Sequence, residues 1–553
     1  MRIRGELKER LCIAFFRPWA HSRPNHARGH KVQWGEKRKI MSTKTFGRIT
    51  ALTILAVLAI PMWTAAQDNP SPDNKPKHKK YKLVDLGTFG GPASELTTNN
   101  GNGAGALILN NRGTLTGSAD TPVPDPFSPN CYLASCFVGH AFQWEDGVLT
   151  DLGAVPGANT SQGTAINEKG QIAGLLQNGN TDPITGGAAT DSVLWRGKKM
   201  TNLGTLGGYQ SVATSINDAG EVVGFSTVPG AIDPYSFLGQ SIHTYYWRNG
   251  VMKDVGTLGG PDAFAGIAHQ LTGAAVGFSF INSIPNPTTG VPTLHPFLWK
   301  NGHMQDLGTL GGTLCCEGSF VANSRGQIAS DSTLVGDLQT HPFLWDKGKL
   351  IDLGTLGGDN GMVFNISENG DVVGIADLPS PQPHHGFLWR HGVMTDLGTL
   401  GRTSSAIAIN SRGQVVGASR IDDTPNNFRA ILWENGGPLV DLNALIPQNS
   451  PLTLAWAVNI NESGEIAGLG VPTGCQPADY LLCGHAYMLI PDGDCDEDNE
   501  ARIAESQRHA DLMRQIPVPV TEGAEPALTP IERLRNMMRQ RYHLPGPAAA
   551  PRD

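Results

Sequence analysis

One phrase recurs eight times in this chain, and the repeat limits the possible folds more than any other feature. The phrase reads DLGTLGG in its commonest form. Its copies begin at Asp85, Asp151, Asn202, Asp254, Asp306, Asp352, Asp396 and Asp441. Most neighbouring copies lie about 45–50 residues apart, a period that is typical of solenoids and propellers.

Three further phrases follow in the same order between copies. They are S-x-A-x-x-I-N (211–217), a turn with Q-V-V-G (414–417) and H-P-F-L-W or its variants (295–299). Each is short, rich in β-branched or aromatic residues and bounded by Gly or Asn, so each predicts a strand. Links such as Asn301-Gly302 predict tight hairpins. With the strand that carries Asp-Leu-Gly, every repeat supplies four antiparallel strands, the content of a propeller blade.

The ends of the repeat region predict how the array closes. The chain enters at residues 81–86 as a lone fourth strand and leaves at 485–489 as a third strand without its partner. If the first strand completes the last blade, no sheet edge stays unpaired. We therefore predict an all-β propeller of eight four-stranded blades over residues 81–490. Seven blades are the alternative if the weak unit at 268–273 is an insertion, and a β-solenoid is the alternative architecture.

The repeated phrases resemble the bacterial family of extracellular repeat proteins named for its HAF motif. The phrases that carry the resemblance are HAFQW (140–144), HPFLW (295–299 and 341–345), DLGTLGG (306–312 and 352–358) and INSRGQVVG (409–417). The resemblance covers residues 81–490 and implies secretion and a repeat fold, but it supplies no catalytic or ligand-binding residues. Asp191 and Arg429 replace the His in two units, and Leu489 stands where other units have Trp.

The segments outside the repeats differ from them in character. Residues 41–66 combine basic residues, a short apolar run and a small-residue end, which predicts a signal peptide; an uncleaved anchor is the alternative. Met41 is the predicted start, which makes 1–40 a non-native N-terminal extension. Residues 67–80 predict a disordered linker. Residues 491–553 predict an acidic linker and a short helical or disordered tail, with a capping box at 529–532.

Charge and export restrict the partners. The chain carries −8 overall, but residues 1–66 hold 13 Lys/Arg and 3 Asp/Glu, so the remainder carries −18. An acidic body repels a phosphate backbone, which disfavours nucleic acid. We predict a secreted, monomeric protein, extracellular or periplasmic, with no stable transmembrane segment in the mature chain.

Cysteines fall in the predicted loops. Cys131 and Cys136 share one long loop before a HAF-type strand, and Cys475 and Cys483 share the equivalent loop of the last unit, so both pairs are disulfide candidates. The adjacent Cys315 and Cys316 allow a vicinal disulfide or two separate thiols. Cys495 leaves an odd count.

Repeated side chains predict structural roles. Six His occupy equivalent positions, too widely separated around a ring to share an ion bound at about 2 Å. We expect each to hydrogen-bond within its own blade. The Trp residues from Trp144 to Trp433 are expected to pack between blades. The Gly-Thr-Leu-Gly-Gly runs open no helix, so they predict blade crossings with positive φ rather than phosphate-binding loops.

Strand alternation places the long loops and the crossings on one rim and the tight turns on the other. Ligands are therefore expected at the long-loop rim or the channel mouth. The sequence predicts a binding or scaffold propeller for a glycan or protein ligand, with no catalytic residue and no cofactor assigned. Two alternatives stay open: a polysaccharide-acting enzyme using loop acids such as Asp233, Asp262 and Asp422, and a Ca²⁺-dependent adhesin using the acidic run at 492–498.

Overall fold

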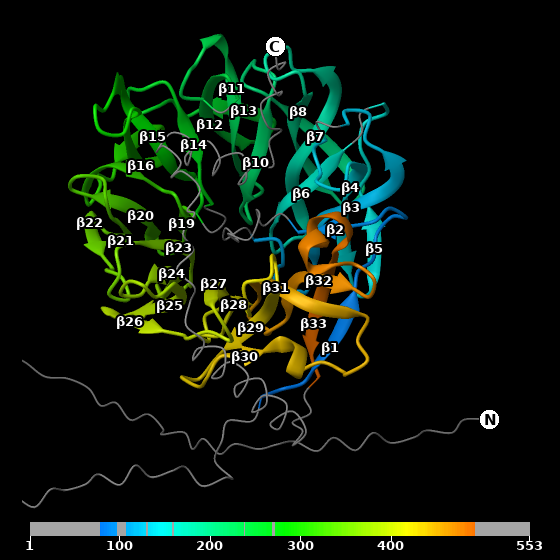
Figure 1. Ribbon diagram of the computed structural model, residues 1–553. Helices are drawn as coiled ribbons and strands as arrows, with labels where there is room; N and C mark the ends of the chain where they lie inside the picture. The colour runs from blue at the N-terminus through cyan, green and yellow to red at the C-terminus, as the bar shows by residue number, and fades with distance from the viewer. Residues whose placement is uncertain are drawn as a thin grey trace, which may run out of the picture. The chain divides into compact units, whose positions relative to one another are not determined.

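The computed structural model describes residues 78–96, 107–128, 131–157, 160–236, 238–267 and 271–492. Over these residues the chain forms eight antiparallel sheets arranged as the blades of a β-propeller (Figure 1). The predicted N-terminal extension, the signal peptide, most of the linker and the C-terminal tail lie outside the described residues. Within the described part of the chain, no helix is long and apolar enough to cross a membrane.

Each blade runs from an inner to an outer strand. Blades 1 to 4 contain β2 (Ser94–Glu95), β3 (Leu115–Pro124), β4 (Phe137–Glu145) and β5 (Val148–Asp151); β6 (Ser161–Ile166), β7 (Gln171–Thr181), β8 (Ala188–Arg196) and β9 (Lys199–Gly204); β10 (Ser211–Ile216), β11 (Val222–Ile232), β12 (Gln240–Arg248) and β13 (Val251–Asp254); and β14 (Ala263–Ala265), β15 (Ala274–Pro285), β16 (Pro292–Lys300) and β17 (His303–Asp306).

The remaining blades follow the same plan. Blades 5 to 8 contain β18 (Gly311–Cys315), β19 (Val321–Ala322), β20 (Ile328–Leu334), β21 (Thr340–Asp346) and β22 (Lys349–Asp352); β23 (Gly361–Ile366), β24 (Val372–Asp377), β25 (His384–Arg390) and β26 (Val393–Asp396); β27 (Thr403–Ile409), β28 (Val415–Arg420), β29 (Phe428–Trp433) and β30 (Val440–Asp441); and β31 (Leu452–Ile460), β32 (Ile466–Pro472), β33 (His485–Pro491) and β1 (Tyr81–Asp85). Short helical turns are η3 (Leu442–Ala444), η4 (Pro477–Asp479) and α1 (Tyr480–Cys483).

The ring closes as the sequence predicts. Strand β1 pairs antiparallel with β33, from Tyr81 opposite Pro491 to Asp85 opposite Tyr487, and the two lie side by side in Figure 1. The weak fourth unit forms a complete blade, so eight blades are confirmed and the seven-bladed alternative is wrong. The solenoid alternative is wrong as well.

Blade 5 departs from the simple pattern because its innermost strand is broken into β18 and β19, which both pair with β20. The break follows Cys315-Cys316, where Cys316 has a φ of 72°. The buried Asp331 carboxylate accepts the amides of Glu317 and Gly318 there, each at 2.7 Å. This carboxylate replaces the strand partner that the turning backbone loses.

Aromatic side chains fill the spaces between blades, as expected for the Trp residues. Trp195 is fully buried, and Tyr246 of blade 3 packs on Trp299 of blade 4 with ring centroids 5.2 Å apart. The Gly of each Val-Val-Gly phrase lets inner strands approach closely. A Cβ at Gly374 or Gly417 would collide with a carbonyl oxygen of the neighbouring strand.

The repeated His and Asp side chains pair within their blades, which confirms their expected structural role. Imidazole Nδ1 lies 2.8–3.1 Å from a carboxylate oxygen in every pair: His140–Asp151, His243–Asp254, His295–Asp306, His341–Asp352, His385–Asp396 and His485–Asp85. The Asp also accepts the amide of the Gly two residues later, as Asp306 does from Gly308 at 2.8 Å. In blade 2 the roles are exchanged, because Asn202 donates to Asp191 at 2.7 Å.

The closing pair predicts an acid-sensitive contribution to stability. Burial raises the pKa of Asp85, but hydrogen bonds from His485 and the Gly87 amide outweigh burial, so the pKa lies below its usual value. A lowered carboxyl pKa stabilises the fold above the unfolded pKa, near 3.9, and this contribution is lost as pH falls through the folded pKa. We therefore expect Asp85→Asn to lower the unfolding temperature by more at pH 7 than at pH 2.5.

Thermal unfolding at both pH values measures this difference. The matched control is Asp146→Asn, which removes one carboxylate from an exposed turn residue. If the difference in unfolding temperature between wild type and Asp85→Asn is as large at pH 2.5 as at pH 7, the Asp85 carboxylate does not contribute the acid-sensitive stability.

A seam of Asn side chains joins the blades at the rim opposite the long loops. Asn110, Asn167 and Asn410 each donate a side-chain N–H to the equivalent carbonyl of the next blade, at 2.9–3.1 Å. Asn461 of the last blade donates to the Asn110 carbonyl at 3.0 Å, which closes the ring a second time. Each of these Asn side chains also accepts amides of its own turn, so one residue shapes the turn and fastens the neighbour.

Candidate functional site

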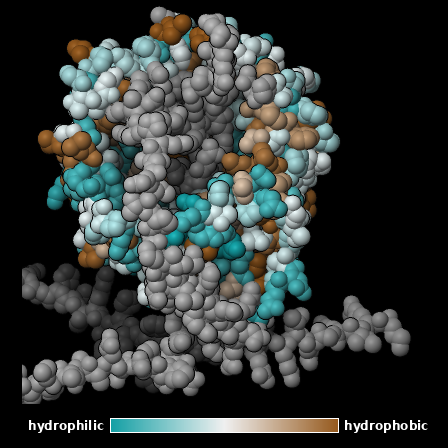
Figure 2. All heavy atoms as spheres, viewed as in Figure 1, coloured by the Kyte–Doolittle hydropathy of each residue, from teal (hydrophilic) through white to brown (hydrophobic). Residues whose placement is uncertain are grey.

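The long-loop rim differs from the opposite rim in what its loops expose. Large aliphatic side chains stand out from the loop ends of successive blades, with exposed fractions of 74% at Ile232, 75% at Ile284, 84% at Val335 and 87% at Leu338. Apolar groups are scattered among hydrophilic ones around the ring in Figure 2. This rim offers apolar contact points on loops that vary from blade to blade.

The long loops of blades 1 to 4 share a turn that the sequence reasoning missed. Asp125, Asp182, Asp233 and Asn286 each precede a Pro, and each accepts the amide of the residue after that Pro, at 2.7–2.9 Å. The first three side chains are also buried. The repeated Asp/Asn-Pro dipeptide was the available signal, because it is a turn-forming pair.

Disulfides brace the same rim. The structure joins Cys131 to Cys136 and Cys475 to Cys483, as predicted, with Cα atoms 5.2 and 6.0 Å apart. It also joins Cys315 to Cys316, which resolves the alternatives left open for that pair. Cys495 lies outside the described residues.

Two of the three loop acids considered for catalysis come together. Asp233 lies in the β11–β12 loop and Asp262 just before β14, and their exposed fractions are 6% and 0%. Asp262 accepts the Ile242 amide at 2.7 Å, and Asp233 accepts the Ser241 hydroxyl at 3.0 Å. Burial, followed by the charge of Asp233, raises the pKa of Asp262 well above its usual value. This pair is enclosed by protein and is a structural pair.

Asp422 does not join them. It accepts the Thr424 amide at 2.9 Å and an Asn427 side-chain N–H at 3.0 Å within its own loop. Asp422 therefore stabilises a loop turn, and the three acids do not form one site.

The raised pKa of Asp262 predicts that Asp262→Asn stabilises the protein in alkaline solution. The folded state keeps the carboxyl proton, whereas the unfolded chain releases it above about pH 3.9, so stability falls as pH rises through the raised folded pKa. Asn carries a permanent N–H in place of that proton. We expect the variant to unfold at a higher temperature than wild type at pH 8, with the gap closing toward pH 4.

Asp262→Ala is the control for this prediction, since it leaves the Ile242 amide without an acceptor and should destabilise at every pH. Thermal unfolding of both variants between pH 4 and 8 provides the measurement. An Asn variant that unfolds earlier than wild type at pH 8 would show that Asp262 is ionised in the fold.

A second pair of acids, Glu95 and Asp120, lies on the adjacent strands β2 and β3 of blade 1, and Asp120 is 2% exposed. Glu95 ends β2, and the Gln162 side chain of blade 2 donates to it at 3.2 Å. Burial raises the pKa of Glu95 to about 7. Burial and the charge of Glu95 raise the pKa of Asp120 to about 6, although a Ser135 hydrogen bond opposes the shift. Carboxyl groups with such pKa values exchange protons near neutral pH.

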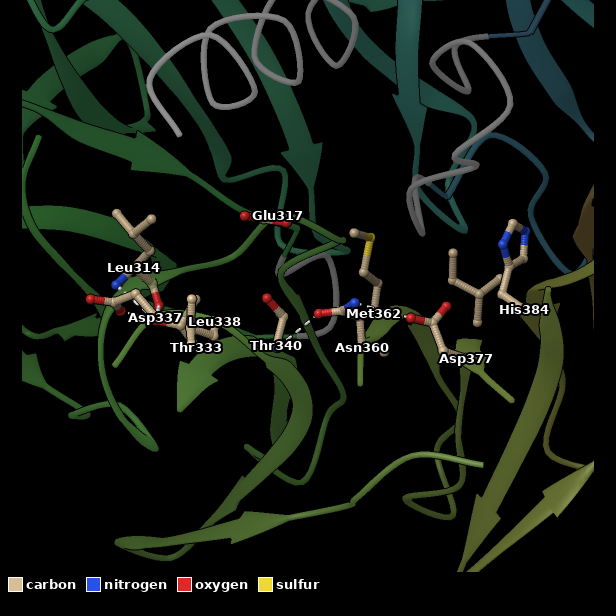
Figure 3. A pocket seen from close by; sticks show the side chains of 12 residues that line it. Leu314, Glu317, Thr333, Asp337, Leu338, Thr340, Asn360, Met362, Asp377 and His384 are labelled. Carbon is tan, nitrogen blue, oxygen red and sulfur yellow. Dashed lines mark hydrogen bonds between the residues drawn. The ribbon is translucent and has the colours of Figure 1, made fainter. Parts of the chain in front are cut away.

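A pocket of about 380 Å³ opens on the long-loop rim between blades 5 and 6, and Figure 3 shows its side chains. It is lined by Leu314, Glu317, Thr333, Asp337, Leu338, Thr340, Asn360, Gly361, Met362, Ile375, Asp377 and His384. We call it the blade 5–6 pocket. Its size falls in the range of small-ligand sites, about 300–1,000 Å³.

Polar groups in the blade 5–6 pocket are held by their neighbours. The Asn360 side chain accepts the Thr340 amide at 3.2 Å and donates to Asp377 at 3.0 Å. Burial lowers the pKa of His384 and outweighs the opposing charge of Asp377, with His385 adding to the decrease. His384 is therefore neutral at pH 7.

No sequence signal predicted either group of residues. Glu95 and Asp120 lie 25 positions apart on adjacent strands of blade 1, and the pocket side chains come from blades 5 and 6, so neither group forms a short sequence motif. Among the residues that the structure describes, no three His, Cys, Asp or Glu side chains are placed to hold a metal ion. Nearly all of the acidic run considered for Ca²⁺ lies outside the described residues, so that role stays a prediction.

Comparison with known proteins concerns the fold. No family model matches the chain, and no curated protein matches it. Similar solved structures include the β-propeller domain of the trilobed protease from Pyrococcus furiosus, which has an open velcro topology (9% identity, 66% of this chain and 96% of that chain, TM-score 0.36). TolB from Acinetobacter baumannii is also similar, with 10% identity over 76% of this chain and 98% of that chain and a TM-score of 0.30. So is a PL25 ulvan lyase, with 10% identity over 66% of this chain and 100% of that chain and a TM-score of 0.34. Likenesses this distant carry no argument about function.

Proposed function

We propose that the chain is a secreted binding or scaffold propeller that takes its ligand on the long-loop rim. The difference between the two rims carries the proposal. The Asn seam fastens the turns of one rim to each other. The other rim has disulfide-braced loops, the blade 5–6 pocket and aliphatic tips that are 74–87% exposed, against 61–66% for Val148, Val251 and Val393 in the hairpins of the Asn-seam rim. Three disulfides and the predicted signal peptide support an oxidising destination.

A ligand screen tests the proposal. The exported protein is immobilised and probed with glycans, cell-wall fragments and peptides, with and without Ca²⁺. Binding should be weakened by Ile284→Ser and Leu338→Ser on the long-loop rim. It should be kept by Val251→Ser, which removes a comparably exposed aliphatic side chain from a hairpin on the opposite rim. Loss of binding in Val251→Ser alone would place the ligand on the opposite rim and contradict the proposal. Strict Ca²⁺ dependence of binding would favour the adhesin alternative.

A polysaccharide-acting enzyme is the second candidate, because Glu95 and Asp120 lie together with pKa values of about 7 and 6. Those values suit general acid–base catalysis near neutral pH. Product formation from a polysaccharide in the same screen, abolished by Glu95→Gln, would replace binding by catalysis as the function.

A further inference from the structure

We propose that the blade 5–6 pocket binds an aliphatic chain ending in a cation, the chemistry of a Lys or Arg side chain. The inference rests on the proposed binding function and names the ligand class for one part of the long-loop rim. Three properties of the lining support it: its charge, its apolar surface and the way its wall is held.

Charge in the pocket favours a cation. The lining holds the carboxyl groups of Glu317, Asp337 and Asp377, and these described lining residues include no Lys or Arg. Asp337 is engaged in its own loop, because it accepts the Thr313 amide, the Thr313 hydroxyl and the Thr333 hydroxyl at 2.6–2.8 Å. Glu317 and Asp377 add carboxyl groups to the lining from adjoining blades, and Asp377 also accepts a hydrogen bond from Asn360 at 3.0 Å. Neutral His384 adds no opposing charge at pH 7.

The apolar part of the lining suits an aliphatic stem. Leu314, Met362 and Ile375 contribute hydrocarbon to the pocket, and Leu338 at its edge is 87% exposed. Long cationic side chains bury their methylene stems along such surfaces while the charged end stays polar. The described lining residues include no Phe, Tyr or Trp, so the His384 imidazole is the one ring among them on which a flat ligand could stack.

The wall that carries Glu317 is held firmly. The buried Cys315–Cys316 disulfide lies between Leu314 and Glu317 in the chain, and Asp331 binds the Glu317 amide behind it. On the facing blade, Asn360 holds Asp377. Groups held in place before binding lose little freedom when a ligand enters, which favours affinity.

The test follows the methyl group of Met362, which lines the pocket. The full-length protein is labelled with [¹³C-methyl]methionine, and Met362→Leu identifies the resonance. Agmatine represents a free amine, acetyl-Gly-Arg-Gly-amide represents a peptide side chain, and butyrate is the anionic control. We expect saturable shifts with both cations and none with butyrate. Tighter binding of the peptide would assign the natural ligand to a protein, and equal binding would assign it to a free amine.

Two charge-removing variants make the test specific. Asp377→Asn can still accept from Asn360, and Glu317→Gln keeps the side-chain size. Each should weaken agmatine binding about two- to fivefold, the scale of one partly exposed ion pair. The matched control, Asp359→Asn, removes a neighbouring exposed carboxylate that bonds to Gln339 outside the pocket, and should bind agmatine as wild type does.

Failure of this inference differs from failure of the proposed function. Shifts with butyrate equal to those with agmatine, or unchanged agmatine affinity in both charge variants, would overturn the ligand class even if the rim screen yields a ligand. Specific agmatine binding in a protein whose screen ligand depends on Val251 would uphold the pocket and overturn the wider assignment of the rim.

Discussion

A chain that lacks residues 81–85 is expected to lose its stable ring. Strand β1 supplies five paired positions along β33, and the buried Tyr81 and partly buried Leu83 pack in the core of blades 7 and 8. The Tyr81 amide donates to the Leu445 carbonyl at 2.9 Å, and Asp85 pairs with His485. Loss of the two apolar contacts alone removes about 3–5 kcal/mol, and the freed edge of β33 would template aggregation. Thermal unfolding and size-exclusion chromatography measure both effects.

A peptide added in trans provides the control for this deletion. A synthetic segment of residues 78–88 can add as a strand to the exposed edge of β33, whereas a scrambled segment cannot keep the register. Recovery of the unfolding temperature with the native peptide alone would show that the strand closes the ring. A deletion variant as stable and monomeric as the full chain would contradict this role for β1.

Replacement of Asn461 by Ala is expected to cause the second largest loss of stability. Asn461 donates to the Asn110 carbonyl and accepts the amides of Ser463 and Glu465, each at 3.0 Å, while only 4% exposed. The substitution removes these three hydrogen bonds, together with the one that the Asn461 side chain donates to the Glu465 carboxylate at 2.6 Å, and leaves buried backbone groups without partners. A cost of about 2–4 kcal/mol follows from typical hydrogen-bond and desolvation values. Chemical denaturation with a two-state fit, where it applies, gives the measurement.

Asn461→Ser separates the turn from the seam. Blade 6 has Ser367 at the equivalent position, and its hydroxyl accepts the amides of Asn369 and Asp371 at 3.1–3.2 Å. Ser at 461 should therefore keep the two turn amides and lose the bonds to blade 1 and to the Glu465 side chain, at roughly half the cost of Ala. Equal losses for Ser and Ala would mean that the turn bonds contribute little.

The repeating parts of the structure were predictable because one residue does the same task in every blade. The spacing of the Asp-Leu-Gly copies predicted the blades, and the unmatched phrases at residues 81 and 485 predicted the closure. The in-blade role of the His and Asp side chains followed from their separation around a ring. Blade 2 shows that the two positions change as a pair: Asp191 replaces the His and accepts, and Asn202 replaces the Asp and donates.

The site could not be predicted in the same way. Glu317 lies in the segment between β18 and β19, Asp377 ends β24 and His384 begins β25, and nothing in the local sequence marks them as neighbours. The Asn seam was not predicted for another reason. Its Asn residues belong to a repeated turn phrase, but their hydrogen bonds to the next blade can be recognised only once the blades are placed side by side. The Asp233–Asp262 pair likewise depends on how the β11–β12 loop packs against blade 4.

Closure by β1 has a consequence for the timing of folding. The partner of Asp85 is His485, four hundred positions later, so the first strand waits for almost the whole array to be made. Contacts so distant in sequence form slowly. The ring can therefore close, and the native structure be completed, only after the last blade has been made.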